Sequence, residues 1–129
     1  MNGDREAFLC RDGWRPVRGA LPYATAKAAI EGLTSVLAVD YGPHGIRANA
    51  VALGSIATER YEEFLSHQTA ESAARTEAET ARLHPLGRVG RADEVAAAYL
   101  LSDAASFVNG AVLPVDGGRA VYGQDPEEC

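Results

Sequence analysis

Helix-forming segments alternate with short apolar runs along this chain, and this order limits the possible folds more than any other feature. The helix-forming segments are 23–41, 58–83 and 95–102, and the strand-like runs are 7–10, 46–53 and 112–116. Strands that are joined through helices give a parallel sheet with right-handed crossovers. The sequence therefore predicts an α/β fold with two to three parallel strands and flanking helices.

The segment 23–41 is the strongest helix prediction. It is rich in alanine, the best helix former, and Gly42-Pro43 ends it. Apolar side chains recur within it at helical spacing, at Ile30, Leu33, Leu37 and Tyr41. Such a stripe normally packs on a sheet. Because two or three strands would leave much of it uncovered, we expect either a marginally stable fold or association with other chains that buries Ile30, Leu33 and Leu37.

The charged segment 58–83 contains few large apolar side chains. We therefore expect one or two helices that are loosely docked on a surface. Pro114 lies inside the last strand-like run, and proline cannot donate to a sheet ladder, so that strand is predicted at the sheet edge. The tail at 124–129 is predicted to be disordered.

Composition excludes several classes of function. The net charge is −6 without a basic patch, which argues against nucleic-acid binding. No apolar run approaches the roughly 20 residues that cross a bilayer, and the polar start does not resemble a signal peptide. Cys10 and Cys129 form neither a disulfide framework nor a metal site, so a cytoplasmic protein is expected. The three histidines lack metal-ligand spacing and are predicted at the surface; they are His44, His67 and His84.

Tyr23 and Lys27 form a candidate pair for proton transfer. They are four residues apart at the start of the predicted helix, so they share one face. A free phenol has a pKa of about 10, and a nearby positive charge lowers it. Such a pair could exchange a proton with a substrate oxygen. The alternative is an interfacial tyrosine and a solvated lysine, because short motifs also occur by chance.

Four segments in this order resemble the C-terminal half of the short-chain dehydrogenase/reductase (SDR) family. They are Tyr23-x-x-x-Lys27, the strand and turn at 46–58, the segment 85–96, and the last strand and turn at 110–118. The resemblance implies the C-terminal part of a Rossmann-like doubly wound parallel sheet at 21–119, with a lid at 58–84. A poorly matched segment at 1–20 and a tail at 120–129 would flank it.

The resemblance also implies NAD- or NADP-dependent hydride transfer between nicotinamide and a small-molecule carbonyl or alcohol. Tyr23 would be the general acid/base, and Lys27 would lower its pKa and bind the nicotinamide ribose. Gly54 would let the backbone approach the cofactor, the Ile56 backbone would meet the carboxamide, and the Thr58 hydroxyl would bond the carboxamide or pyrophosphate. No metal is implied, and a homo-oligomer is expected.

Structural explanations compete at several of these positions. Gly54 can serve only as a turn residue, and Thr58 is also a suitable N-cap for a following helix. Asn49 can simply satisfy nearby backbone groups. Asp116-Gly117-Gly118 is predicted to be only a turn.

The chain departs from the family pattern. It has no glycine-rich turn to hold a pyrophosphate, and Leu53 stands where the family has proline before Gly54. No serine precedes Tyr23; Cys10 stands 13 residues before it, and a thiol is a weaker donor than a hydroxyl. We therefore expect a truncated SDR that is inactive as an isolated chain. The alternative is a non-catalytic remnant, or an oligomerisation or interaction module, that binds no dinucleotide.

Overall fold

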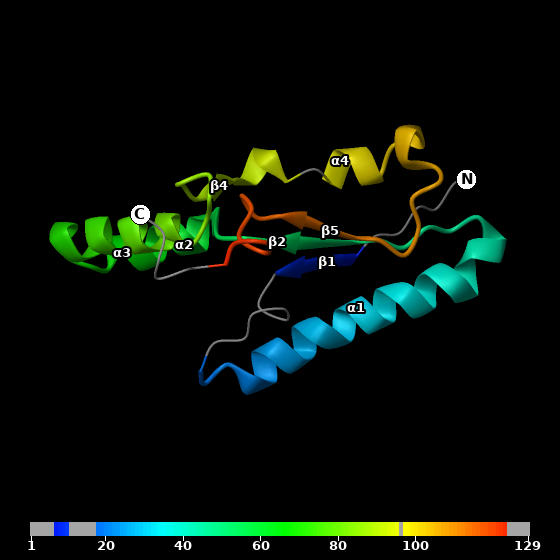
Figure 1. Cartoon of the computed structure of the whole chain (residues 1–129), viewed down its shortest axis with the longest axis horizontal. Coiled ribbons are helices and arrows are strands. Elements are labelled where there is room, and N and C mark those ends of the chain that lie inside the picture. The colour runs from blue at the N-terminus through cyan, green and yellow to red at the C-terminus, as the bar shows by residue number, and fades with distance from the viewer. Residues whose placement is uncertain (1–6, 11–17, 96, 124–129) are drawn as a thin grey trace. The chain divides into compact units, whose positions relative to one another are not determined.

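A computed structural model of the chain describes residues 7–10, 18–95 and 97–123 (Figure 1). The chain divides into two compact units. The first takes its residues from 1–53 and 95–115, and the second from 54–94 and 116–129. The predicted tail at 124–129 lies outside the described residues.

The first unit contains a parallel sheet in the order β1-β2-β5. Its strands are β1 (Ala7–Cys10), β2 (Ala50–Leu53) and β5 (Val112–Val115). Both pairings are parallel, with Ala50 aligned to Ala7 on one side and to Val112 on the other. The predictions of an α/β fold, of parallel pairing and of an edge position for the strand that contains Pro114 are confirmed.

The central strand β2 is buried on both faces. Ala50, Val51 and Ala52 are each at most 2% exposed, so the strand reads as a continuous apolar run instead of an alternating one. The strand was predicted from residue 46, but it begins at Ala50. The preceding residues form other backbone hydrogen bonds: the Ala48 N–H donates to the Asn109 side chain, and the Ala48 carbonyl accepts the Gly110 N–H.

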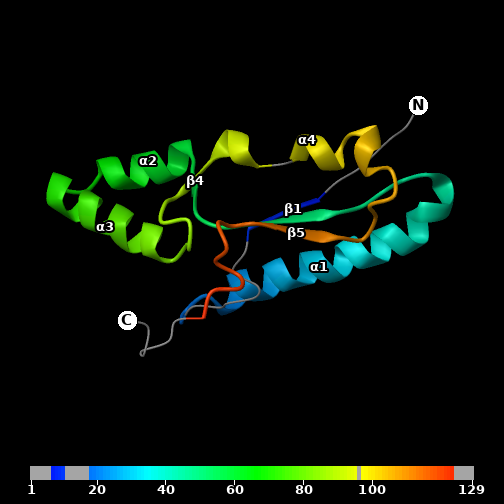
Figure 2. The same cartoon turned by 45° about the horizontal axis from the view of Figure 1, so that its top comes forward.

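Helix α1 (Leu21–Tyr41) lies along one face of this sheet, and the short helix α4 (Ala97–Leu100) lies along the other, in both views (Figures 1 and 2). Pro22 stands in the first turn of α1, where a missing N–H removes no helical hydrogen bond. The 3-10 turn η1 (Gly42–His44) follows, and Gly45 ends it with a φ of +73°. The predicted stop at Gly42-Pro43 is therefore confirmed.

The predicted apolar stripe of α1 is left partly uncovered, as expected. Thr34 and Ala38 are buried, whereas Leu33 is 51% exposed and Tyr41 is 47% exposed. Small side chains at the contact let the helix approach its neighbours closely; a Cβ on Gly110 would lie 3.3 Å from the Cβ of Ala38. The Thr34 hydroxyl donates to the Ile30 carbonyl at 2.8 Å, so its burial leaves no donor unsatisfied.

Buried polar side chains tie the start of β2 to the segment 100–111. Asn49 donates to the Val108 carbonyl and accepts from the Ala111 N–H, both at 3.0 Å. The Arg47 guanidinium donates to the carbonyl oxygens of Val108 and Leu100. Asn49 was predicted to satisfy local backbone groups. It does bond backbone groups, but they are about sixty positions away in the sequence, so the prediction was right about the kind of partner and wrong about its location.

The second unit contains a two-stranded parallel sheet and two helices. Its elements are β3 (Ile56–Ala57), α2 (Glu59–Ser66), α3 (Ala70–Arg82), β4 (Gly90–Arg91) and the 3-10 turn η2 (Ala92–Glu94). Neither helix has a fully buried residue, in line with the few large apolar side chains predicted to anchor them. The β3–β4 pair could not be predicted from the sequence, because two-residue strands carry no periodicity.

The helix predicted at 95–102 is shorter than expected. Of the described residues within 95–102, only Ala97–Leu100 are α-helical, and the 3-10 turn η3 (Asp103–Ala105) follows them. None of the helices within the described residues has both the length and the apolar character required to span a bilayer.

Candidate functional site

Tyr23 and Lys27 lie together near the start of α1. The Lys27 Nζ atom is 5.3 Å from the centre of the Tyr23 ring, a cation–π distance. Tyr23 is 41% exposed, so its ring is not turned into a packed interior. The helical spacing therefore places an ammonium group on a tyrosine that solvent or a ligand can reach.

The other three predicted site residues belong to the second unit and follow one another along a single segment. Gly54 is buried, Ile56 opens β3, and Thr58 is the N-cap of α2. The Thr58 Oγ1 atom accepts the Tyr61 N–H at 3.3 Å. The predicted N-cap role of Thr58 is thus confirmed, whereas a role toward a ligand stays a prediction.

Gly54 is required by packing and not by its backbone angles. Within the described residues, it is not among the glycines with positive φ. A Cβ on Gly54 would lie 2.8 Å from the Asp116 Cα and 2.9 Å from the His84 Nε2, closer than real side chains come. The absence of a side chain at Gly54 therefore allows its backbone to pack against the Asp116 backbone and the His84 imidazole.

The turn after β5 is held by the Asp116 carboxylate. One carboxylate oxygen accepts the Gly118 N–H at 2.9 Å, and the other accepts the Ala120 N–H at 2.7 Å. Gly117 and Gly118 both have positive φ, which favours glycine there. The prediction that Asp116-Gly117-Gly118 forms a turn is confirmed.

The peptide group of Ser55 is fixed from both sides. Its N–H donates to the His84 Nε2 at 3.1 Å, and its carbonyl accepts the Gly90 N–H at 2.9 Å. The β3–β4 pairing continues this contact, with Ile56 aligned to Gly90. The segment 54–57 is therefore a fixed turn and strand rather than a free loop.

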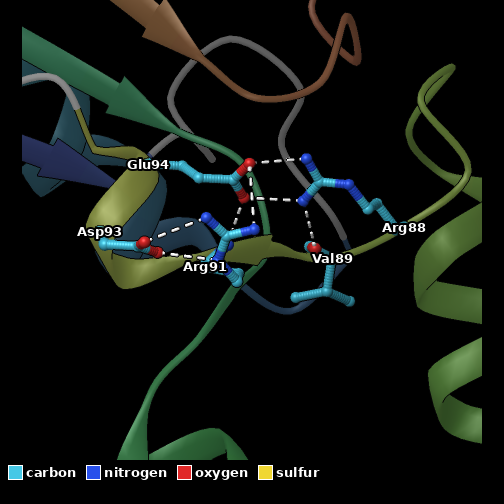
Figure 3. Close-up of polar contacts among 5 residues, drawn as sticks. All are labelled: Arg88, Val89, Arg91, Asp93 and Glu94. Carbon is cyan, nitrogen blue, oxygen red and sulfur yellow. Dashed lines mark hydrogen bonds and ion pairs between the residues drawn. The ribbon is translucent and has the colours of Figure 1, made fainter.

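An ion cluster holds the other side of this pairing in place (Figure 3). Arg88 donates to both carboxylate oxygens of Glu94, at 2.7 and 2.6 Å. Arg91 donates to both oxygens of Asp93 through its side chain and to Glu94 through its backbone N–H. These bonds close a compact turn directly after β4. Asp93 and Glu94 therefore bind arginines from within the 3-10 turn η2.

The cluster changes the acidity of its carboxyl groups. The hydrogen bond from Arg88, with the backbone N–H of Arg91, lowers the pKa of Glu94 to about 2. The hydrogen bond from Arg91 lowers the pKa of Asp93 below its ordinary value. Both carboxylates stay ionised well into the acid range. These exposed pairs are structural and lie outside the predicted catalytic set.

His84 is the residue near this turn that the sequence analysis placed wrongly. It was predicted at the surface, but it is only 3% exposed and both of its ring nitrogens are hydrogen-bonded. Its signal in the sequence is weak, because a histidine before a proline looks like any loop residue. His44 and His67 are exposed, as predicted. No group of three or more metal-binding side chains occurs among the described residues.

A groove of about 500 Å³ lies elsewhere in the first unit. Its lining includes Gly42, Arg47, Phe107 and Asn109. This groove adjoins the C-terminal end of α1. At about 1.5 Å of rise per residue, Tyr23 is roughly 27 Å from Tyr41 along that helix. The groove and the Tyr23–Lys27 pair are therefore separate features.

Comparison with known proteins identifies the family. A family model described as enoyl-(acyl carrier protein) reductase matches residues 12–120. The chain belongs to the SDR family. Levodione reductase of Leifsonia aquatica is 42% identical over 110 residues, which cover 84% of this chain and 41% of that protein.

Solved structures of SDR proteins have the same fold. The crystal structure of levodione reductase matches with a TM-score of 0.80 and 38% identity, covering 92% of this chain and 46% of that one. YwfH, an NADPH-dependent reductase of bacilysin biosynthesis, matches with a TM-score of 0.78 and 28% identity, over 88% of this chain and 45% of that one. This SDR chain therefore spans less than half the length of these relatives.

Proposed function

We propose that this chain carries the nicotinamide side of an NAD- or NADP-dependent oxidoreductase site for a small-molecule carbonyl or alcohol. The observation that carries the proposal is the 5.3 Å approach of the Lys27 ammonium to the exposed Tyr23 ring, in a chain of the SDR family. Relatives described as a levodione reductase and as an NADPH-dependent reductase support the reaction class. They do not indicate which substrate this chain would accept.

The donors at these positions fit the oxygen-rich groups of a dinucleotide. Among the described residues, the contact of the Lys27 ammonium is the Tyr23 ring, so its three N–H donors remain for ribose hydroxyls. The oxygen of Thr58 accepts from Tyr61, which leaves the hydroxyl hydrogen to donate. The Ile56 backbone lies on a segment fixed by β4, and would meet the carboxamide. When bound, the dinucleotide would supply or accept the hydride.

Tyr23 would act as the general acid/base in this reaction. Its hydroxyl would give a proton to a carbonyl oxygen as it becomes an alcohol, or take one in the reverse direction. The positive charge of Lys27 favours the phenolate and so assists both directions. The helices α2 and α3, which have no fully buried residue, would form the lid that excludes water from the substrate.

We expect the isolated 129-residue chain to have no turnover. The sequence supplies no glycine-rich turn for the pyrophosphate and no serine upstream of Tyr23. Calorimetric titration with NADH and with NADPH tests the cofactor role directly. Binding in the micromolar range would support it, and no heat up to a concentration of about 1 mM, which corresponds to roughly −4 kcal/mol, would refute it.

Substitution of Tyr23 tests the catalytic role wherever turnover is found. Tyr23→Phe removes the hydroxyl and keeps the ring that Lys27 contacts, so turnover should be lost while circular dichroism stays unchanged. Undiminished turnover in this variant would exclude Tyr23 as the acid/base.

A second function is favoured by the exposed apolar face of α1. Leu33, Val36 and Val39 are 51%, 54% and 75% exposed, and they repeat every three residues along the helix. Such a face is typical of a protein–protein contact. A chain that binds neither NADH nor NADPH, but that self-associates through α1, would be an oligomerisation module and not an enzyme.

A further inference from the structure

His84 occupies the junction of three segments in the second unit. It follows the last residue of α3 by two positions and is 3% exposed. Its backbone N–H donates to the Ala81 carbonyl, and its carbonyl accepts the Gly87 N–H. The residue is therefore anchored to the end of α3 through its main chain as well as through its ring.

The two partners of the imidazole assign its tautomer. The Nδ1 atom is 3.0 Å from the Thr80 carbonyl oxygen, which can only accept, so Nδ1 carries the hydrogen. The Nε2 atom is 3.1 Å from the Ser55 nitrogen, whose N–H donates, so Nε2 offers its lone pair. This arrangement requires the neutral imidazole, since a doubly protonated ring would have no acceptor for Ser55.

The space around the ring is closed by glycines. A Cβ on Gly54 would lie 2.9 Å from the Nε2 atom, and a Cβ on Gly117 would lie 3.3 Å from the His84 Cβ. The Leu86 N–H, two residues beyond His84, donates to the Gly117 carbonyl at 3.2 Å. The imidazole is thus packed between the turn at 54–55 and the turn at 116–118, with little room to rotate.

We propose that His84 is a positioning residue that holds the Ser55–Ala57 segment in register with the C-terminal end of α3. The proposal rests on the function proposed above, in which this segment meets the nicotinamide and α3 belongs to the lid. One ring nitrogen holds α3 and the other holds Ser55, so a displacement of the lid end is transmitted to the segment that would bind the cofactor.

Histidine suits this role because of its donor and acceptor geometry. A neutral imidazole places one donor and one acceptor on different edges of a rigid ring. Lysine and arginine only donate, ionised carboxylates only accept, and serine or threonine is too short to reach both Thr80 and Ser55. Glutamine and asparagine can each imitate one edge of the ring, which gives a matched pair of test variants.

The first experiment tests the link itself in the full chain. In His84→Gln the Oε1 atom can replace Nε2 and accept from Ser55, whereas in His84→Asn the Nδ2 atom can replace Nδ1 and donate to Thr80. Amide hydrogen exchange at Ser55 should accelerate by about tenfold or more in His84→Asn and His84→Ala, and by less than about threefold in His84→Gln. The Ala50 amide, which bonds to the Ala111 carbonyl in the first unit, is the control and should not change.

Two results of this experiment would overturn the proposal. One is equal exchange at Ser55 in the Gln and Asn variants. The other is a wild-type nitrogen-15 spectrum of the imidazole in which Nε2, and not Nδ1, carries the hydrogen. The spectrum reads the tautomer directly and does not depend on whether any variant folds.

The second experiment tests the consequence for cofactor binding. The Kd for NADH should rise by about tenfold in His84→Asn, or roughly 1.4 kcal/mol, and by less than about threefold in His84→Gln. Equal Kd values for NADH in both variants would show that the contact from His84 to Ser55 does not affect cofactor binding, and would overturn the proposal. If the wild-type chain binds neither NADH nor NADPH, the proposed dinucleotide function fails, and the exchange at Ser55 alone then decides whether His84 fixes this segment.

Discussion

Gly54 and Asp116 approach so closely that a Cβ on Gly54 would lie 2.8 Å from the Asp116 Cα. The segment that leaves β2 therefore meets the segment that leaves β5 backbone to backbone, within the second unit. In a parallel sheet, ligands bind where neighbouring strands end, at their carboxyl edge. Gly54 is thus needed to form the turn, whether or not a cofactor later contacts it.

This contact predicts that Gly54→Ala destabilises the chain. The new methyl group would meet backbone and a buried imidazole, neither of which can move freely. Overpacking of this kind costs about 1–3 kcal/mol in the free energy of unfolding. Urea denaturation measures the loss.

Gly32→Ala is the matched control for that substitution. Gly32 lies in α1, and a Cβ there meets nothing within 4 Å. Replacement of a helical glycine by alanine should stabilise the chain by about 0.5–1 kcal/mol. If both variants shift stability in the same direction, crowding at Gly54 is not the cause.

A second prediction concerns two asparagines with opposite burial. Asn49 is fully buried and Asn109 is exposed, yet the side chain of each bonds one backbone N–H and one carbonyl. Asn49→Ala leaves the Ala111 N–H without its acceptor and empties a fully buried side-chain site, whereas the Val108 carbonyl keeps its bond from Arg47, so the expected cost is about 1–3 kcal/mol. Water can replace the side chain in Asn109→Ala, which should cost about 1 kcal/mol. Equal losses of unfolding free energy in urea would contradict this account.

A third prediction concerns the acidity of Glu94. Its folded pKa of about 2 lies below the ordinary value of about 4.3. Its contribution to stability is therefore fully present above about pH 4.3, and it is lost as the pH falls through about 2. Carbon-13 titration of the Glu94 carboxyl should show the low value in the wild-type chain and a return toward the ordinary value in Arg88→Gln.

Arg91→Gln separates the two contributions to that pKa. The Arg91 side chain binds mainly Asp93, whereas its backbone N–H donates to Glu94 and remains in the variant. The Glu94 pKa should therefore rise less in Arg91→Gln than in Arg88→Gln. A larger rise in Arg91→Gln would show that the Arg88 pair is not the main cause.

A fourth prediction concerns the exposed face of α1. If a second copy covers Leu33, Val36 and Val39, then Val36→Lys should shift the chain from a dimer or larger species to a monomer in sedimentation velocity. Ser66→Lys adds the same charge at an exposed position of α2, outside this face, and should leave the assembly intact. A wild-type chain that is already monomeric at micromolar concentration would rule out the interface.

Local chemistry explains which elements the sequence predicted well. The alanine-rich start of α1, the Gly42-Pro43 stop and the Thr58 cap depend on neighbours within a few residues. Pro114 predicted an edge strand because a missing N–H has the same effect in any sheet. The spacing of Tyr23 and Lys27 was sufficient to bring their side chains together on one helical face.

Distant partners explain what the sequence analysis missed. The helical period of 3.6 residues permits several faces of α1 to be buried, and packing on the sheet selected Thr34 and Ala38 over Leu33. The strand predicted at residue 46 begins at Ala50, because the backbone groups of Ala48 bond to a loop that lies about sixty positions away.

The sequence by itself therefore determined the order of helices and strands, the parallel sheet, the family and the Tyr23–Lys27 pair. These features follow from periodicity, propensity and motif, which act over short spans of chain. Only the tertiary structure decided that His84 is buried with a defined tautomer and that Gly54 is needed against Asp116. Both depend on segments about thirty to sixty residues apart that meet in space, and such contacts leave no local pattern.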